Sequence, residues 1–137
     1  MPSAAFESLA GLPYFIAYFG LSLALLTACL VIYVAITPYA EIRLIREGNS
    51  AAAATLSGVL LGFALPLGSA VAHSVSLLDM LVWAIVALVV QLVAYAAVRL
   101  AVPQVVQHVR EGQVAGGVFL GAVAVSLGIL NAACMTY

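Results

Sequence analysis

The chain has 137 residues, of which 66% are hydrophobic and only 7% are charged, and its formal net charge is −1. A soluble domain carries about 25% charged residues, so this chain cannot cover its surface in water, and the lipid bilayer must be its partner along much of its length. Its four basic residues form no basic patch, and we therefore expect no nucleic-acid partner.

Four apolar segments predict an all-α integral membrane protein with four transmembrane helices. Roughly 20 apolar residues span the hydrocarbon, and each span must be helical because lipid cannot hydrogen-bond an open backbone. Residues 1–12 are predicted to form a short outer segment, and residues 13–137 the four-helix membrane domain. Pro38 is expected to end the first span. The spans are predicted at about residues 13–37, 50–72, 77–100 and 114–137.

The distribution of arginines predicts the orientation of the four spans. The middle connection, at residues 73–79, contains no arginine or lysine, and neither does the N-terminal segment. Because positively charged loops stay in the cytoplasm, we expect the first and third connections to be cytoplasmic and both termini to lie outside. The arginines in or beside those two connections are Arg43, Arg46, Arg99 and Arg110.

The two arginine-bearing loops resemble each other. Each contains Arg-Glu-Gly, then an amide, then small residues. We therefore predict two tandem hairpins of the same orientation, at about residues 13–72 and 77–137, related as a parallel repeat about an axis along the membrane normal. The matching stretches are Arg46-Glu47-Gly48-Asn49 and Arg110-Glu111-Gly112-Gln113.

The loop residues allow a structural and a functional interpretation. Gly48 and Gly112 are predicted to end short helices in a left-handed conformation, and Asn49 is predicted to cap the helix that follows. Alternatively, the two loops form a docking surface for a cytoplasmic partner. The candidate docking residues are Arg46, Glu47, Gly48, Asn49, Arg110, Glu111 and Gly112.

Small residues recur every four positions along the second span and every three or four positions along the fourth. Such stripes let helix backbones approach closely, so they need a partner helix within the protomer or in another copy. We expect a homo-oligomer that uses these stripes. The stripe of the second span is Ala54, Gly58, Gly62, Pro66 and Ala70, and that of the fourth includes Gly117, Gly121, Ala124, Gly128 and Ala132.

A few polar residues inside the spans are candidates for a membrane site. Gln91 lies well inside the third span, where a buried amide needs a partner. The repeat places Thr27 at the matching position of the first span, and the two could form an interhelical hydrogen bond or a polar constriction. Asn131 is a further candidate. Pro66 is predicted to free the carbonyl four residues earlier, either as a packing kink or as a hinge.

Longer stretches carry a resemblance to a known family. They are the loop with its Arg46-Glu47-Gly48-Asn49, then Gly58-Val59-Leu60-Leu61-Gly62-Phe63-Ala64-Leu65-Pro66-Leu67, and the closing Gly128-Ile129-Leu130-Asn131. Together with Gln91 they resemble the bacterial family called domain of unknown function 350. The positions that match its motif are Glu47, Gly48, Asn49, Gly62, Pro66, Gln91 and Asn131.

The resemblance implies a multi-pass protein of the bacterial cytoplasmic (inner) membrane. Relatives are often encoded beside phage-shock-like membrane-remodelling proteins, which implies a role in envelope stress or membrane maintenance and a cytoplasmic membrane-remodelling protein as partner. The family supplies no catalytic residue to carry over.

Three functional classes are open to a membrane protein of this kind: an enzyme, a non-enzymatic component, and a channel or transporter. The sequence contains no nucleophile with a base, no phosphate-binding loop and no metal cluster, so we expect neither an enzyme nor a bound cofactor. No ionisable residue is expected deep in a span, which argues against an active transporter. The first hypothesis is therefore an oligomeric, non-enzymatic membrane component. The alternative is a passive channel or transporter for ions or small solutes, based on Thr27, Gln91 and Pro66.

Overall fold

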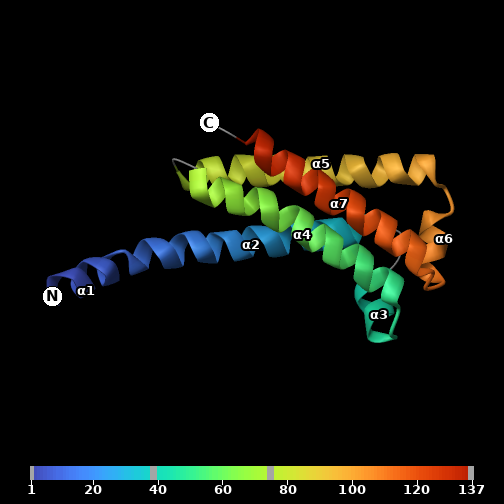
Figure 1. Ribbon diagram of the computed structural model, residues 1–137, viewed down its shortest axis with the longest axis horizontal. Coiled ribbons are helices and arrows are strands. Elements are labelled where there is room, and N and C mark those ends of the chain that lie inside the picture. Colours follow the sequence, from blue (N-terminus) through green and yellow to red (C-terminus); the bar gives the residue numbers. More distant parts are fainter. Residues whose placement is uncertain (1, 38–39, 74–75, 136–137) are drawn as a thin grey trace.

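The computed structural model describes residues 2–37, 40–73 and 76–135. Within these ranges the chain forms seven helices (Figure 1). Four helices are long and apolar enough to cross a membrane, which confirms the predicted all-α membrane fold. The helices are α1 (Pro2–Ala10), α2 (Leu12–Ile36), α3 (Glu41–Arg46), α4 (Ser50–His73), α5 (Leu77–Ala101), α6 (Val105–Arg110) and α7 (Val114–Cys134).

The boundaries of the first span follow from local chemistry. Gly11 joins α1 to α2 with a helical backbone (φ −80°, ψ −10°), and the apolar helical segment runs from Ala5 to Ile36. Its other end is at Thr37, whose backbone is extended (ψ 142°), as expected for a residue before proline. Pro38 itself lies outside the described residues, as do the last two residues of the fourth predicted span.

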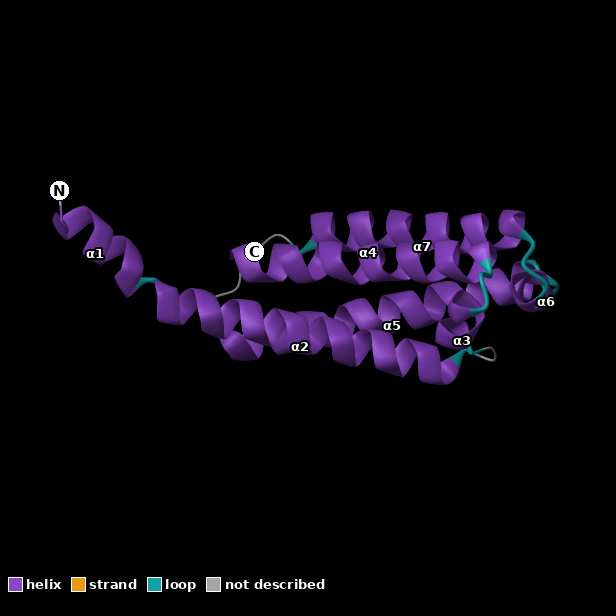
Figure 2. Ribbon diagram, turned by 90° about the horizontal axis from the view of Figure 1, so that it is seen from below, coloured by secondary structure: helices purple, strands orange, loops and turns teal. Residues whose placement is uncertain are grey.

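The four long helices form two layers. Figure 2 shows α4 and α7 side by side, with α2 and α5 beneath them. Helix α5 packs against both α4 and α7, whereas α2 packs mainly against α4 and α5. The short helices α3 and α6 lie at the end of the bundle opposite to the start of α2 and the last turn of α7 (Figure 1). We call this the loop end.

The small-residue stripes of α4 and α7 face each other within one protomer. A Cβ atom on Gly128 would lie 2.6 Å from Gly62 Cα, and one on Gly121 would lie 2.6 Å from the Ala54 carbonyl oxygen. The backbones are therefore in direct contact, which no larger side chain permits. The stripes thus find a partner helix inside the protomer, and homo-oligomerisation stays a prediction.

Hydroxyl groups strengthen this seam. Ser69 donates to the Ala132 carbonyl at 3.2 Å, which joins α4 to α7. The Thr55 hydroxyl lies 2.9 Å from the Ala51 carbonyl of its own helix and 3.3 Å from the Gly117 carbonyl of α7, so these two acceptors share its single proton. Such bonds stabilise membrane helix pairs because lipid offers the groups no alternative partner.

The core lies in the half of the bundle near the loop end. The ring of Tyr33 packs edge-on against Phe63 and Tyr95, with centroids 6.3 and 5.9 Å apart. By contrast, α1 and the start of α2 project beyond the other helices (Figure 1), and Phe15 and Phe19 are more than half exposed. A surface this apolar is suited to contact with lipid.

Candidate functional site

The two loops have the same backbone geometry. Gly48 and Gly112 have φ angles of +86° and +76°, which confirms the predicted left-handed ends of the short helices. In each loop the glycine N–H donates to the carbonyl three residues earlier, and the following N–H donates to the carbonyl five residues earlier. This is the Schellman pattern of a helix C-terminus. The sequence similarity of the loops therefore encodes one local structure, while the relation between the complete hairpins stays a prediction.

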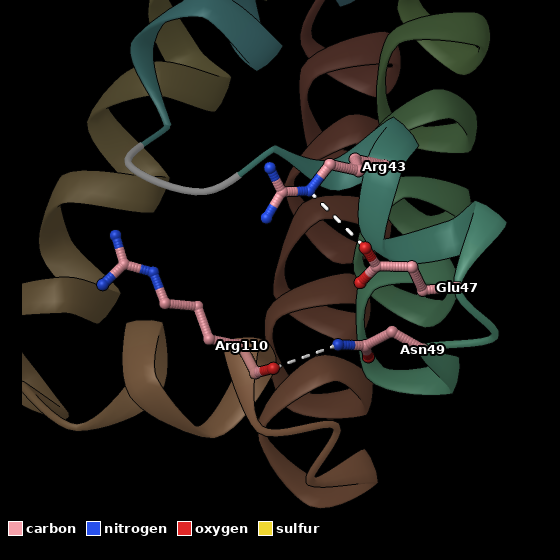
Figure 3. Close-up of polar contacts among 4 residues, drawn as sticks. All are labelled: Arg43, Glu47, Asn49 and Arg110. Carbon is pink, nitrogen blue, oxygen red and sulfur yellow. Dashed lines mark hydrogen bonds and ion pairs between the residues drawn. The ribbon is translucent and has the colours of Figure 1, made fainter.

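Asn49 ties the first loop to the second. Its Oδ1 accepts a hydrogen bond from the Ala52 N–H at 3.0 Å, which confirms the predicted cap of α4. Its Nδ2 donates to the Val109 carbonyl at 2.8 Å and to the Arg110 carbonyl at 3.4 Å (Figure 3). The corresponding amide, Gln113, donates to Glu111 in its own loop at 3.2 Å. The link between the loops therefore depends on Asn49.

The two loops together line a shallow, open depression of about 300 Å³, which we call the loop groove. Six of the seven candidate docking residues line it, and only Arg46 does not. Two regions that are far apart in the sequence thus contribute to one surface. The lining residues are Leu44, Glu47, Gly48, Asn49, Arg110, Glu111 and Gly112.

The charges at the loop groove are partly compensated. Arg43 Nε lies 3.6 Å from Glu47 Oε1, an exposed pair one helical turn apart (Figure 3). Glu111 accepts hydrogen bonds from Gln107 at 2.8 Å and from Gln113 at 3.2 Å. Arg46 and Arg110 are exposed. The carboxylates thus have partners, and the solvent-facing edge of the loops is positively charged.

Gln91 and Pro66 meet at one point in the interior. Gln91 is 2% exposed, and its Nε2 donates to the Ala124 carbonyl at 2.9 Å and to the Gly62 carbonyl at 3.3 Å. Gly62 is the residue whose helical hydrogen bond Pro66 removes, because proline has no N–H. Gln91 therefore supplies the donor that Pro66 cannot. We call Gln91, Gly62 and Ala124 the carbonyl junction, where α5, α4 and α7 meet.

The structure does not bring Thr27 or Asn131 to this junction. Thr27 is exposed, and its hydroxyl donates to the Leu23 carbonyl of its own helix at 2.8 Å. The buried residue Cys29 follows it by two positions, about 200° around the helix, so Thr27 lies on the outer face of α2. Asn131 is partly exposed near the end of α7, and no described residue is hydrogen-bonded to its side chain.

Glu41 is a buried acid that sequence reasoning missed. It is 0% exposed, and neither carboxyl oxygen has a hydrogen-bond partner among the described residues. Burial raises the pKa of Glu41 to about 7, against a smaller lowering effect of Thr37, whose hydroxyl donates to the Val34 carbonyl. A signal was present: Glu41 shares one face of α3 with Leu44 and Ile45, at the i, i+3, i+4 spacing of an apolar stripe.

Glu41 belongs to no cluster of metal-binding side chains among the described residues. Within the described ranges, no three His, Cys, Asp or Glu side chains gather closely enough to hold a metal ion.

Comparison with known proteins places the chain in a family. The sequence profile of Domain of Unknown Function (DUF350) matches residues 7–135. The chain belongs to this family. It is 43% identical over 123 residues to the UPF0719 inner membrane protein YjfL of Escherichia coli K12 and to that of E. coli O157:H7, covering 90% of this chain and 93% of each relative. No solved structure matches the chain significantly.

The residues that carry the DUF350 resemblance fall mainly into the two sites described above. Glu47, Gly48 and Asn49 line the loop groove. Gly62 and Gln91 form the carbonyl junction with Ala124, and Pro66 explains the need for it. Asn131 belongs to neither site. Most of the motif residues, although scattered along the sequence, therefore lie at one surface site, the loop groove, or at one interior site, the carbonyl junction.

Proposed function

We propose that this DUF350 protein is a non-enzymatic, multi-pass component of the bacterial inner membrane that binds a cytoplasmic protein through its loop groove. One observation carries the proposal: two similar loops, far apart in the sequence, line a single groove. The name of YjfL as an inner membrane protein and the arginines of both loops support the location and the cytoplasmic side.

The chemistry of the loop groove suits an acidic protein segment. Arg110, which lines the groove, is exposed, as is Arg46 at the end of α3, and arginine forms strong paired hydrogen bonds with carboxylates. The groove carboxylates of Glu47 and Glu111 already have partners, so they oppose such a ligand less than free carboxylates would. Asn49 fixes the two loops relative to each other before binding, which lowers the entropic cost of association.

The family resemblance motivates a proposal for the partner. We propose a cytoplasmic membrane-remodelling protein and, with it, a role in envelope stress or membrane maintenance. The loop groove is suited to this role because it lies at the membrane surface where such a protein acts.

Photocrosslinking in native cells tests the docking proposal. A photoreactive residue in place of Gln113, beside the loop groove, should form an adduct with one protein, and the same residue in place of Phe15 should not. The double variant Arg46→Gln/Arg110→Gln should abolish the adduct. Arg99→Gln is the control for charge, because Arg99 lies on α5 outside the loop groove. It is compared with the single variant Arg110→Gln, which also removes one positive charge.

Two results would refute the docking proposal. One is an unchanged adduct in the double variant, and the other is adducts with lipid alone. Lipid adducts would assign the arginines to phospholipid headgroups.

Homo-oligomerisation is a separate proposal and needs a surface that the contact between α4 and α7 leaves open. An open groove of about 420 Å³ runs along the α4–α7 seam, and its lining includes the stripe residues Ala54, Gly58 and Gly121 as well as Ala122 and Ser126. We propose this face for contact with a second copy. Ala122→Leu should then shift the oligomer distribution in native mass spectrometry, whereas an unchanged distribution would exclude this face.

The alternative of a passive channel or transporter loses its main support. Gln91 is engaged by two carbonyls, and Thr27 faces away from it, so the two do not form a polar constriction within one protomer. Flux through purified protein in liposomes tests this alternative. Transport of an ion or small solute that disappears in Gln91→Leu at equal protein incorporation would revive it.

A further inference from the structure

Two buried oxygen-bearing groups at the loop end have no partner among the described residues. Glu41 is fully buried, and neither of its carboxyl oxygens has a hydrogen-bond partner in the described part of the chain, because the nearby Thr37 hydroxyl, which lowers the pKa of the acid, donates its proton to the Val34 carbonyl. The hydroxyl of Tyr95, a residue that is only 6% exposed, lacks such a partner there as well. Buried polar groups are almost always paired, so two of them near each other call for an explanation.

The surroundings of Glu41 offer it no positive charge in direct contact. From α2 and α5, the phenol groups of Tyr33 and Tyr95 lie within electrostatic reach of the carboxyl. Arg99 acts on Tyr95 more strongly than Glu41 does, and Arg110 acts less strongly, but the described residues give Glu41 no ion pair. Helix α4, which packs on α3, contains no ionisable residue except His73 at its far end.

This environment selects the neutral form of the acid. An ionised carboxylate without donors is far costlier to bury than a neutral carboxylic acid. Burial accordingly raises the pKa of Glu41 to about 7, close to the pH of a bacterial cytoplasm. The short helix α6 supports this interpretation, because its position equivalent to Glu41 is Val105, which is 1% exposed. The site therefore suits an uncharged side chain.

We propose that Glu41 is a proton-binding site at the loop end of the bundle, neutral while α3 is docked and ionised when α3 moves out. On docking, the carboxylate takes one proton from water and becomes a carboxylic acid; on undocking, it returns that proton to water. The site goes beyond the docking role of the loop groove and does not depend on it.

Infrared titration of the purified full-length protein in liposomes tests the proton site. Between about pH 5 and pH 9, the wild-type protein should show a protonated-carboxyl band that disappears with a midpoint near neutral pH. Glu41→Gln should lack the band. Glu47→Gln, which removes an exposed carboxylate beside the same helix, should retain it. Identical titrations of wild type and Glu41→Gln would overturn the proposal.

Hydrogen exchange provides a second test that needs no variant. After correction for the intrinsic rate, exchange of the α3 amides should rise about tenfold or more between about pH 5.5 and pH 8, because the ionised acid favours the undocked helix. Exchange of the α6 amides, the internal control, should not change. A parallel response of both helices would contradict the proposal. Should Glu41→Gln fail to fold, Glu41→Val places in α3 the residue that α6 carries.

Discussion

Gln91 and Pro66 lie on different helices and yet act as a pair. In lipid, the carbonyl that Pro66 leaves without a helical donor has no water to bind. The side chain of Gln91 supplies that donor to Gly62 and also binds Ala124. At the scale of single residues, the sequence makes Gln91 a candidate pore residue, but Pro66 on the neighbouring helix α4 explains its buried amide.

A double-mutant cycle tests this pairing. Gln91→Leu should lower the free energy of unfolding by about 1–3 kcal/mol, because it leaves a buried carbonyl unpaired. In a Pro66→Ala background the loss should be smaller, since the new N–H can bond to Gly62 within α4. Unfolding in mixed detergent micelles measures both losses, and equal losses in the two backgrounds would show that the residues are independent.

Glu41 should give the protein a characteristic pH dependence. Because its pKa is raised from 4.5 to about 7 in the folded state, the folded protein binds the proton more tightly than the unfolded chain. The resulting stability is fully present below about pH 4.5 and is lost as the pH rises to about 7, a change of about 3 kcal/mol. Glu41→Gln should remove this decline from the unfolding free energy measured against pH. Parallel curves would contradict it.

At the scale of elements, α3 and α6 are two copies of one local structure, and the side chain of Asn49 links their loops. Both are six residues long and end at a left-handed glycine. Asn49 donates across to the other loop, whereas Gln113 donates within its own loop, so the two equivalent amides have unequal roles.

The unequal roles of the loop amides can be measured. Asn49→Ala should cost about 1–2 kcal/mol, because it removes the cap of α4 together with the bonds to α6. Gln113→Ala should cost less than about 0.5 kcal/mol, since its hydrogen bond is exposed. Faster hydrogen exchange in residues 105–112 of the first variant alone would locate the effect, and equal costs would refute the distinction.

The α4–α7 seam should tolerate no added methyl group. Gly128→Ala places a Cβ 2.6 Å from the Gly62 backbone, which cannot yield without separating the helices, and it should cost at least about 1–3 kcal/mol. Gly68→Ala is the control, because nothing lies within 4 Å of its new Cβ, and it should be neutral or stabilising. Thermal unfolding of the two variants tests this, and similar midpoints would argue against the tight seam.

At the scale of the whole molecule, the four arginines lie toward the loop end, and α1 with the start of α2 projects from the opposite end (Figure 1). The proposed orientation places the loop end in the cytoplasm. The loop groove and the proton site both depend on that orientation, since a cytoplasmic partner and cytoplasmic pH act only there.

Cysteine labelling tests the orientation. In a background with Cys29 and Cys134 replaced by alanine, Glu7→Cys should react with a membrane-impermeant maleimide once the outer membrane is opened. Gln113→Cys should react only after the inner membrane is disrupted as well. Labelling in the reverse order would invert the topology.

The sequence by itself determined the four spans, the left-handed glycines, the cap at Asn49 and the family. Each depends on hydrophobicity, backbone hydrogen bonding or a residue's own conformational preference, which act over a few neighbouring positions. Only the tertiary structure decided that the stripes of α4 and α7 face each other, that Gln91 binds the carbonyl freed by Pro66, that Thr27 faces outward and that Glu41 is buried. These features depend on how each helix is rotated about its axis, and that rotation is fixed by contacts between distant parts of the chain.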